Sequence, residues 1–251
     1  MKNISFIIFI FLSTSCARNT SVTKTEQLSY LDSIIPYMEG FAKDTATFYD
    51  KRFNNNGSII SIVGKFIDSK KVYALDVLEK DTLINFYHFN KNKWQLLGSG
   101  RITFGTTFNI EFEDMNGNGL NEIIVFSPSN MNGNSCQDVY SYSEVIDSIH
   151  YVGSFPTDFE IDKKNKTVRV SYEGSWYAPF IKTLYKWQNE KLIRVKEIEL
   201  ALVNSDIRND ERIFRYYENP NTNQDSLILK IEAPYKKEKY KKLWDNFFEN
   251  N

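Results

Sequence analysis

The sequence predicts a mainly β protein: an antiparallel meander of hairpins, arranged as a small β-propeller-like domain or as stacked sheets. One observation is an aromatic content of 15%, with 19 Phe and 15 Tyr, because aromatic side chains favour strands and packed sheet faces. Another is a strand–turn–strand segment that recurs along the chain. The last is an Asn- and Gly-rich loop between two strand-like runs. Short helices are expected near both ends of the domain.

The N-terminus has the order of a secretory signal. Lys2 precedes the apolar run 4–12, which is followed by the small residues 13–15 and then by Cys16. A charged start, an apolar core of this length and small residues before the cut define a signal peptide, and the run is too short to span a bilayer as an anchor. A cysteine at this point resembles the bacterial lipobox, in which Cys16 would be diacylated. Plain secretion and an uncleaved anchor are the alternatives.

We therefore divide the chain into a signal peptide at residues 1–15, a lipid tether at 16–27 and a single β-rich domain at 28–251. Removal of the signal peptide leaves 236 residues (251 minus 15), enough for one sizeable core or two small ones. The net charge of −1 gives no broad attraction to nucleic acid, so no nucleic-acid partner is expected. Apolar residues at helical spacing over 28–41, interrupted by Pro36, predict a short helix or two.

The body of the domain repeats one pattern: an aromatic-x-aromatic strand, a polar turn and a second strand. It occurs at 86–98, 139–153 and 184–195. The spacing of about 45–55 residues is in the range of propeller blades or stacked hairpin units. Residues 155–170, with a polar turn at 162–166, predict a further hairpin. About four such units fit between residues 58 and 233.

The Asn- and Gly-rich loop spans residues 114–122 and reads Asp-Met-Asn-Gly-Asn-Gly-Leu-Asn-Glu. Ca²⁺ takes roughly six to eight oxygen ligands, and the loop offers side-chain oxygens at alternating positions together with one backbone carbonyl. The predicted ligands of a structural Ca²⁺ are Asp114, Asn116, Asn118, Leu120 (through its carbonyl) and Glu122. Gly117 and Gly119 stand where a tight loop needs φ above zero. An unmetallated Asn-Gly hairpin turn is the alternative.

This loop is not an EF-hand, because its twelfth position is Val125 instead of a bidentate Glu. It lies between two predicted strands: residues 108–112 alternate apolar and polar, and residues 123–126 are continuously apolar. The strand–loop–strand unit resembles the calcium loop of FG-GAP/VCBS-type repeats, with Asn118 and Glu122 where that family prefers Asp. Two carboxylates carry less negative charge than that pattern, so we expect a weaker affinity for Ca²⁺.

Three further features have simpler interpretations. Cys136 follows a polar loop and is expected to be a small residue entering a strand, unpaired if Cys16 carries lipid. His88 and His150 lie in predicted strands without metal-ligand spacing, so neither is a good catalytic candidate. A basic amphipathic helix is predicted after Pro234, which either packs on the sheet with solvated lysines or touches anionic lipid.

A succession of motifs extends from the calcium loop towards the C-terminus. In order, the motifs are Tyr-Ser-Tyr at 140–142, strand segments at 155–162 and 166–171, Glu-Gly-Ser-Trp-Tyr at 173–177 and Leu-Tyr-Lys-Trp at 184–187. This order resembles the periplasmic lysozyme-inhibitor-like bacterial lipoproteins that carry a single calcium loop. The resemblance implies that an exposed loop enters the cleft of a peptidoglycan-cutting glycosidase and contacts its paired carboxylates. The nearest counterpart of that loop is Gly174, Ser175, Trp176 and Tyr177; a plain hairpin corner with Trp176 packed inward is the alternative.

These observations lead to two hypotheses about function. The resemblance implies an envelope lipoprotein, with a structural calcium site, that binds and sterically inhibits a lysozyme-like hydrolase or toxin. The alternative is a calcium-stabilised, β-propeller-like binding module for another envelope protein or glycan. The chain has no nucleophile-elbow motif, phosphate loop or zinc-type His pair, so we expect it not to be an enzyme.

Lipidation at Cys16 would place the protein on a membrane of the cell envelope. Ala17 and Arg18 lack the acidic signal for retention at the inner membrane. The expected location is therefore the outer membrane, with the protein facing the periplasm.

Overall fold

A computed structural model of the chain describes residues 32, 48–54, 57–78, 82–103, 109–127, 135–156, 159–173, 178–188, 190–202, 212–221 and 224–249, with side chains from residue 60 onward and at residue 32. The predicted signal peptide and the tether with Cys16 lie outside the described residues. Of the predicted N-terminal helix only Asp32 is described, and it is helical and exposed. No helix within the described ranges is long and apolar enough to cross a bilayer.

The described strands form three antiparallel sheets, each a meander in which every strand pairs with its successor in sequence. The first sheet contains β1 Phe48–Asn54, β2 Gly57–Gly64, β3 Tyr73–Leu78, β4 Leu83–Asn90 and β5 Lys93–Arg101. The second contains β6 Asn109–Glu113, β7 Glu122–Ser127, β8 Cys136–Ser143 and β9 Ser148–Pro156. The third contains β10 Phe159–Asp162, β11 Thr167–Tyr172, β12 Phe180–Gln188, β13 Lys191–Leu202, β14 Arg212–Glu218 and β15 Ile228–Pro234. Helix α2, Glu238–Asp245, follows the last strand.

The mainly β, antiparallel architecture predicted from the sequence is therefore confirmed. The three repeated segments are the hairpins β4–β5, β8–β9 and β12–β13, and the fourth predicted hairpin is β10–β11. The grouping differs from the expected four or so equal units, because the strands form sheets of five, four and six strands. Cys136 enters a strand, as predicted: it is the first residue of β8, and it is buried.

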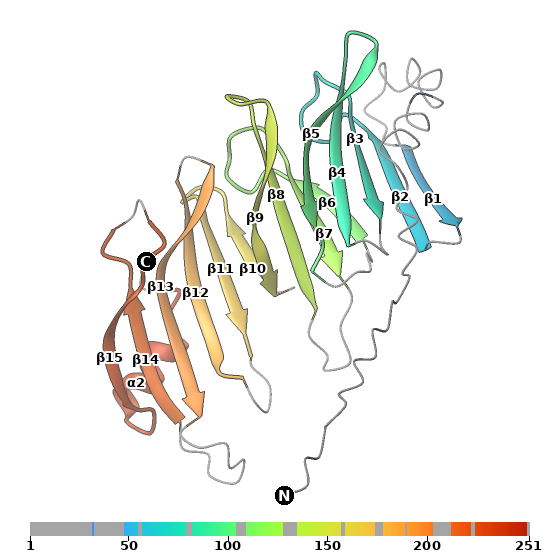
Figure 1. The fold of residues 1–251 in the computed structure, drawn as a ribbon. Coiled ribbons are helices and arrows are strands. Elements are labelled where there is room, and N and C mark those ends of the chain that lie inside the picture. The colour runs from blue at the N-terminus through green and yellow to red at the C-terminus, as the bar shows by residue number, and fades with distance from the viewer. Residues whose placement is uncertain are drawn as a thin grey trace, which may run out of the picture.

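The sheets follow one another in chain order across the molecule, from the blue and green first sheet to the orange and red third sheet (Figure 1). Alternate connections gather at one end of the sheets, called the turn end below. It is made by residues 65–72, 91–92, 114–121, 144–147 and 163–166. Contacts between sheets confirm this grouping: the backbone N–H of Asn121 donates to the carbonyl of Ile67 at 2.9 Å, and His150 Nε2 donates to the carbonyl of Glu190 at 3.0 Å.

Three hydrophobic clusters hold the layers together. The first packs the first sheet on the second and includes Tyr73, Leu75, Phe86, Ile123, Val125 and Tyr140. The second joins the second and third sheets and includes Met115, Val139, Phe155, Val168, Val170 and Trp187. The third packs α2 on the third sheet and includes Ile198, Leu200, Phe214, Tyr240 and Phe247. Because the second sheet is covered on both faces, its strand β8 is buried along its whole length.

Helix α2 packs on the sheet in the way that its amphipathic pattern predicts. Tyr240 is buried and its ring stacks on Phe214, with 5.1 Å between the ring centroids. The lysines between residues 236 and 242 are exposed. The predicted C-terminal helix and its packed face are thus confirmed.

Candidate functional site

The loop predicted to bind calcium joins β6 to β7 and is folded around the carboxylate of Asp114. The backbone N–H groups of Gly117 and Asn118 donate to Asp114 Oδ1 at 2.8 and 3.1 Å, and the N–H of Gly119 donates to Oδ2 at 3.0 Å. Gly117 has φ of 72° and Gly119 has φ of 86°, a region in which glycine is favoured. The two glycines let the chain curl back, so that consecutive N–H groups point at one carboxylate.

The two asparagines of the loop continue this arrangement. Asn116 Oδ1 accepts the backbone N–H of Asn118 at 3.0 Å, and Asn118 Oδ1 accepts that of Leu120 at 2.8 Å. An amide oxygen has two lone pairs, and each of these hydrogen bonds uses one. The second lone pair of each oxygen is therefore compatible with a cation that the same loop would surround.

Glu122 closes the loop and is almost fully buried. Its Oε2 accepts the backbone N–H of Met115 at 2.8 Å, and its Oε1 accepts the Asn116 amide at 2.7 Å and the Ser141 hydroxyl at 2.9 Å. Burial raises the pKa of Glu122 to about 7, the charge of Asp114 adds to the shift, and the hydrogen bonds from Met115 and Ser141 oppose it. Two carboxylates close together in a poorly hydrated place favour a positive charge between them.

The donor set fits a Ca²⁺ ion in a structural role. The loop would supply most of the six to eight or so oxygens that the ion takes, with water completing the shell. These oxygens would come from Asp114, Asn116, Asn118, the carbonyl of Leu120 and Glu122. Within the described residues, no cluster of three or more His, Cys, Asp or Glu side chains suited to a metal is present. A Ca²⁺ ion held by this loop would therefore depend on amide and carbonyl oxygens as much as on carboxylates.

The loop also contacts all three sheets. The Asn121 side-chain amide donates to the carbonyl of Phe66 at 2.9 Å, and Leu120 packs on the cluster between the first and second sheets. Met115 is fully buried in the cluster between the second and third sheets. Next to the loop, Lys163 of the β10–β11 turn forms an ion pair with Glu113 of β6 at 3.0 Å. Anything that fixes this loop therefore also fixes the contacts of the second sheet with the first and third sheets.

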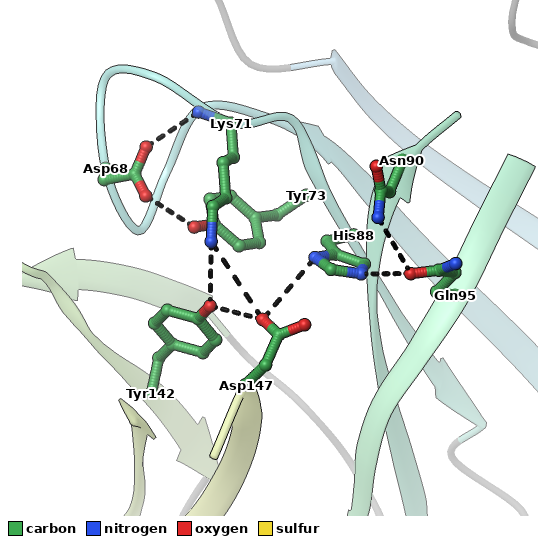
Figure 2. Close-up of polar contacts among 8 residues, drawn as sticks. All are labelled: Asp68, Lys71, Tyr73, His88, Asn90, Gln95, Tyr142 and Asp147. Carbon is green, nitrogen blue, oxygen red and sulfur yellow. Dashed lines mark hydrogen bonds and ion pairs between the residues drawn. The ribbon is translucent and has the colours of Figure 1, made fainter. Parts of the chain in front are cut away.

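A second group of polar side chains lies at the turn end, between the first sheet and the β8–β9 turn. Figure 2 shows Lys71, Tyr142 and His88 pointing toward the carboxylate of Asp147. The Tyr142 hydroxyl donates to Asp147 Oδ1 and accepts a hydrogen bond from Lys71 Nζ at 3.0 Å. His88 Nδ1 lies 3.7 Å from the same carboxylate oxygen, and Lys71 Nζ lies 4.0 Å from it. The carboxylate at the end of one hairpin is thus held by residues of two sheets.

Hydrogen bonds on either side fix the members of this group. His88 pairs across β4–β5 with Gln95, and its Nε2 donates to Gln95 Oε1 at 2.8 Å. Asp68 accepts the Tyr73 hydroxyl at 2.6 Å and the backbone N–H of Lys71 at 2.7 Å. Burial raises the pKa of Asp68, but these hydrogen bonds outweigh it and hold the pKa below its ordinary value. The hydrogen bond between Lys71 and the Tyr142 hydroxyl raises the pKa of the Lys71 ammonium.

From the sequence, His88 was not expected to be a catalytic residue, and neither Asp147 nor Lys71 was predicted to belong to a site. The available signal was the cross-strand pairing of His88 with Gln95 around a two-residue turn, which follows from the hairpin register. Nothing in the sequence placed Asp147 beside His88, because they belong to different sheets.

The β8–β9 turn that carries Asp147 exposes an aliphatic pair. Val145 is 88% exposed and Ile146 is 69% exposed, although such residues are usually buried. Asp147 has φ of 48° and is held by Tyr142, so the turn presents these side chains in a fixed position. The loop predicted to bind a partner, residues 174–177, lies outside the described residues. The strand ends that flank it, Tyr172 of β11 and Phe180 of β12, lie at the opposite end of the sheets from the turn end.

Comparison with known proteins gives a distant likeness in fold to solved structures. No protein-family profile matches the chain, and no curated protein matches it. A solved structure described as a Xanthomonas type IV secretion system related protein is 12% identical, covering 74% of this chain and 99% of that chain with a TM-score of 0.41. At this level the likeness carries no inference about function.

Proposed function

We propose that this protein is a calcium-stabilised binding module of the bacterial envelope, anchored by lipid on Cys16 and without catalytic activity of its own. One Ca²⁺ would occupy the loop at residues 114–122 and stabilise the junction of the three sheets. We further propose that the three successive meanders are arranged like blades of a small, open propeller. The exposed turns would then serve as contact surfaces for another protein.

One segment carries this proposal, residues 66–71 between β2 and β3. At one end, the carbonyls of Phe66 and Ile67 accept hydrogen bonds from Asn121, which adjoins the last two ligands of the calcium loop. At the other end, Lys71 holds Tyr142 and lies near Asp147 beneath the exposed aliphatic pair. A short, hydrogen-bonded segment therefore connects the candidate metal site with the most exposed apolar turn. Calcium binding would order the loop at residues 114–122 and the β8–β9 turn together.

A protein is the partner that the exposed turn suits best. Val145 and Ile146 form a rigid apolar tip that could fill a pocket with little loss of conformational entropy. The tip is flanked by the acidic residues Glu144 and Asp147, which would be repelled by the negative surface of an anionic membrane. This charge pattern favours a protein surface over a lipid surface.

The more specific proposal is inhibition of a lysozyme-like peptidoglycan hydrolase, and the order of motifs from the calcium loop to residue 187 supports it. Ser175 would face the paired carboxylates of the enzyme, and Trp176 or Tyr177 would supply an aromatic anchor. A combined Ser175→Ala and Tyr177→Ala variant should weaken inhibition at least about tenfold. Unchanged inhibition by a folded variant would move the contact surface away from residues 174–177.

Calorimetric titration with CaCl₂ tests the metal site. The purified protein should bind one Ca²⁺, and Asp114→Asn should weaken binding because it removes one of two carboxylate charges from the loop. Asp162→Asn is a matched control, since Asp162 also accepts a backbone N–H in a turn, that of Asn165 at 3.0 Å, outside the calcium loop. Absence of calcium binding by the wild-type protein would refute the metal site.

Affinity capture with Ca²⁺ present tests the partner. A panel of lysozymes and of envelope proteins would be passed over immobilised wild-type protein and over a Val145→Ser, Ile146→Ser variant. Capture of a muramidase with loss of its activity supports inhibition. Capture of a purified, identified envelope protein that the variant loses supports the binding module without an inhibitory role. Equal capture by wild type and variant would exclude the β8–β9 turn as the contact.

A further inference from the structure

A cavity of about 230 Å³ lies between helix α2 and the third sheet. Its walls are apolar on both sides, with Ile198, Phe214 and Ile231 from the sheet and Leu243 and Phe247 from the helical segment. An apolar cavity of about 150 Å³ is large enough for benzene. This cavity is larger, with room for an aliphatic chain of roughly six to nine carbons.

A lysine borders this apolar space. Lys196 of β13 lines the cavity, and its ammonium lies 5.3 Å from the centroid of the Phe247 ring. Burial lowers the pKa of Lys196, while the charge of Glu218 opposes the shift. No carboxylate among the described residues forms an ion pair with Lys196; Glu218, its cross-strand partner, accepts the Tyr216 hydroxyl. A partly desolvated ammonium beside an apolar cavity favours an anionic group on whatever fills the cavity.

The surrounding charge has the same sign. Residues 236–245 contain five lysines against Glu238 and Asp245, and these lysines are exposed. Two further cations lie in the third sheet, Lys182 in β12 and Arg212 in β14. Lys182 Nζ donates to the carbonyl of Trp244 at 2.9 Å, and Arg212 lies 3.9 Å from the centroid of the Phe180 ring. Positive charge on the helix and on the sheet that enclose an apolar cavity attracts an amphiphile with a negative head.

We propose that this cavity binds a free aliphatic carboxylate, with its hydrocarbon chain between α2 and the sheet and its carboxylate paired with Lys196. A neutral alcohol of the same length would fill the apolar space but leave Lys196 unpaired. A cationic amphiphile would meet repulsion from Lys196. The site shares no residue with the calcium loop or with the β8–β9 turn, so it stands independently of the function proposed above.

Calorimetry with sodium octanoate, octan-1-ol and octyltrimethylammonium tests the proposal on the purified protein. Octanoate should bind with the highest affinity, the alcohol about tenfold more weakly and the cation not measurably. Lys196→Met, which retains an unbranched side chain, should weaken the affinity for octanoate about tenfold, and Lys196→Arg should retain the wild-type affinity. Lys242→Met, at an exposed lysine of α2, should weaken octanoate binding far less than Lys196→Met does and serves as the control.

The comparison of octanoate with octanol needs no variant, so the test stands even if a substitution fails to fold. Equal affinity for the acid and the alcohol would overturn the role of Lys196. Absence of saturable octanoate binding below its micellar concentration would overturn the site. Binding only to anionic vesicles, with no binding of monomeric octanoate, would make α2 a membrane-contacting helix and overturn the proposal.

Discussion

Replacing Met115 by alanine should destabilise the protein more than any single change to the exposed part of the calcium loop. Met115 is the second residue of that loop, yet its side chain is fully buried between the second and third sheets. Large-to-small changes of this kind cost about 2–5 kcal/mol. The neighbouring Val139 and Val168 are also fully buried and belong to paired strands, which limits collapse around the cavity. We therefore expect a loss in the upper half of that range, about 3–5 kcal/mol.

Urea unfolding, followed by tryptophan fluorescence, measures this loss, because Trp187 lies in the same cluster as Met115. The slope of the unfolding free energy against urea should stay unchanged while the midpoint falls. Met115→Leu is the control, since a change that roughly conserves volume costs less than about 1.5 kcal/mol. Both variants retain the backbone N–H that donates to Glu122.

The Met115→Ala variant should also change how much Ca²⁺ stabilises the protein. Ca²⁺ that binds the folded protein, as proposed above, would stabilise it by about 2.7 kcal/mol at a concentration one hundred times the dissociation constant. Met115→Ala should loosen the backbone between Asp114 and Asn116, so the stabilisation by Ca²⁺ should be smaller in the variant. A loss below about 1 kcal/mol in both calcium and EGTA would refute the packing of the loop between the second and third sheets.

Three other outcomes follow from the same contacts. Gly119→Ala should cost about 1–2 kcal/mol through backbone strain alone, measured as a lower melting temperature, because Gly119 has φ of 86° and no atom lies within 4 Å of the added Cβ. Tyr142→Phe should cost about 1–3 kcal/mol, because it removes the hydroxyl between Lys71 and Asp147, and should speed hydrogen exchange at 144–147. The pKa of Asp68 is lower in the fold than its ordinary value of 3.8. The ionised carboxylate therefore contributes to folding stability above pH 3.8, and this stability is lost as the pH falls through the folded pKa. Acid unfolding below about pH 4 should therefore be steeper for wild type than for Asp68→Asn, and equal slopes would contradict this.

The hairpins were predictable because each is a local feature. In β4–β5 the turn residues Lys91 and Asn92 have φ of 49° and 61°, and polar residues between two aromatic strands predicted that turn. The grouping of hairpins into sheets was not predictable in the same way. Which consecutive strands pair, and where one sheet stops and the next begins, depends on contacts between faces that no local pattern encodes. Sequence spacing thus suggested about four similar units, whereas the sheets have five, four and six strands.

The two polar sites differ for the same reason. The loop at residues 114–122 could be proposed as a calcium site from the sequence because its oxygen donors lie within nine consecutive residues and alternate with glycines. The group around Asp147 is assembled from Lys71, His88 and Tyr142, which come from three strands or connections in two sheets. Buried Asp138 is a similar case, since its carboxylate is held by the backbone and hydroxyl of Thr103, both at 2.6 Å. Such sites appear only after the sheets have packed.

The calcium loop serves two requirements at once because its residues alternate in direction. Asp114, Asn116 and Asn118 turn their oxygens into the loop, whereas Met115 and Leu120 turn outward into two different hydrophobic clusters. Loss of the ion would leave Asp114 and the buried Glu122 without a compensating charge, and the resulting repulsion would act on a backbone to which both clusters are attached. Calcium removal should therefore loosen the first–second and second–third sheet contacts together, and hydrogen exchange should rise in β7 and β11 in parallel. A rise confined to residues 114–122 would show that the loop opens without disturbing the cores.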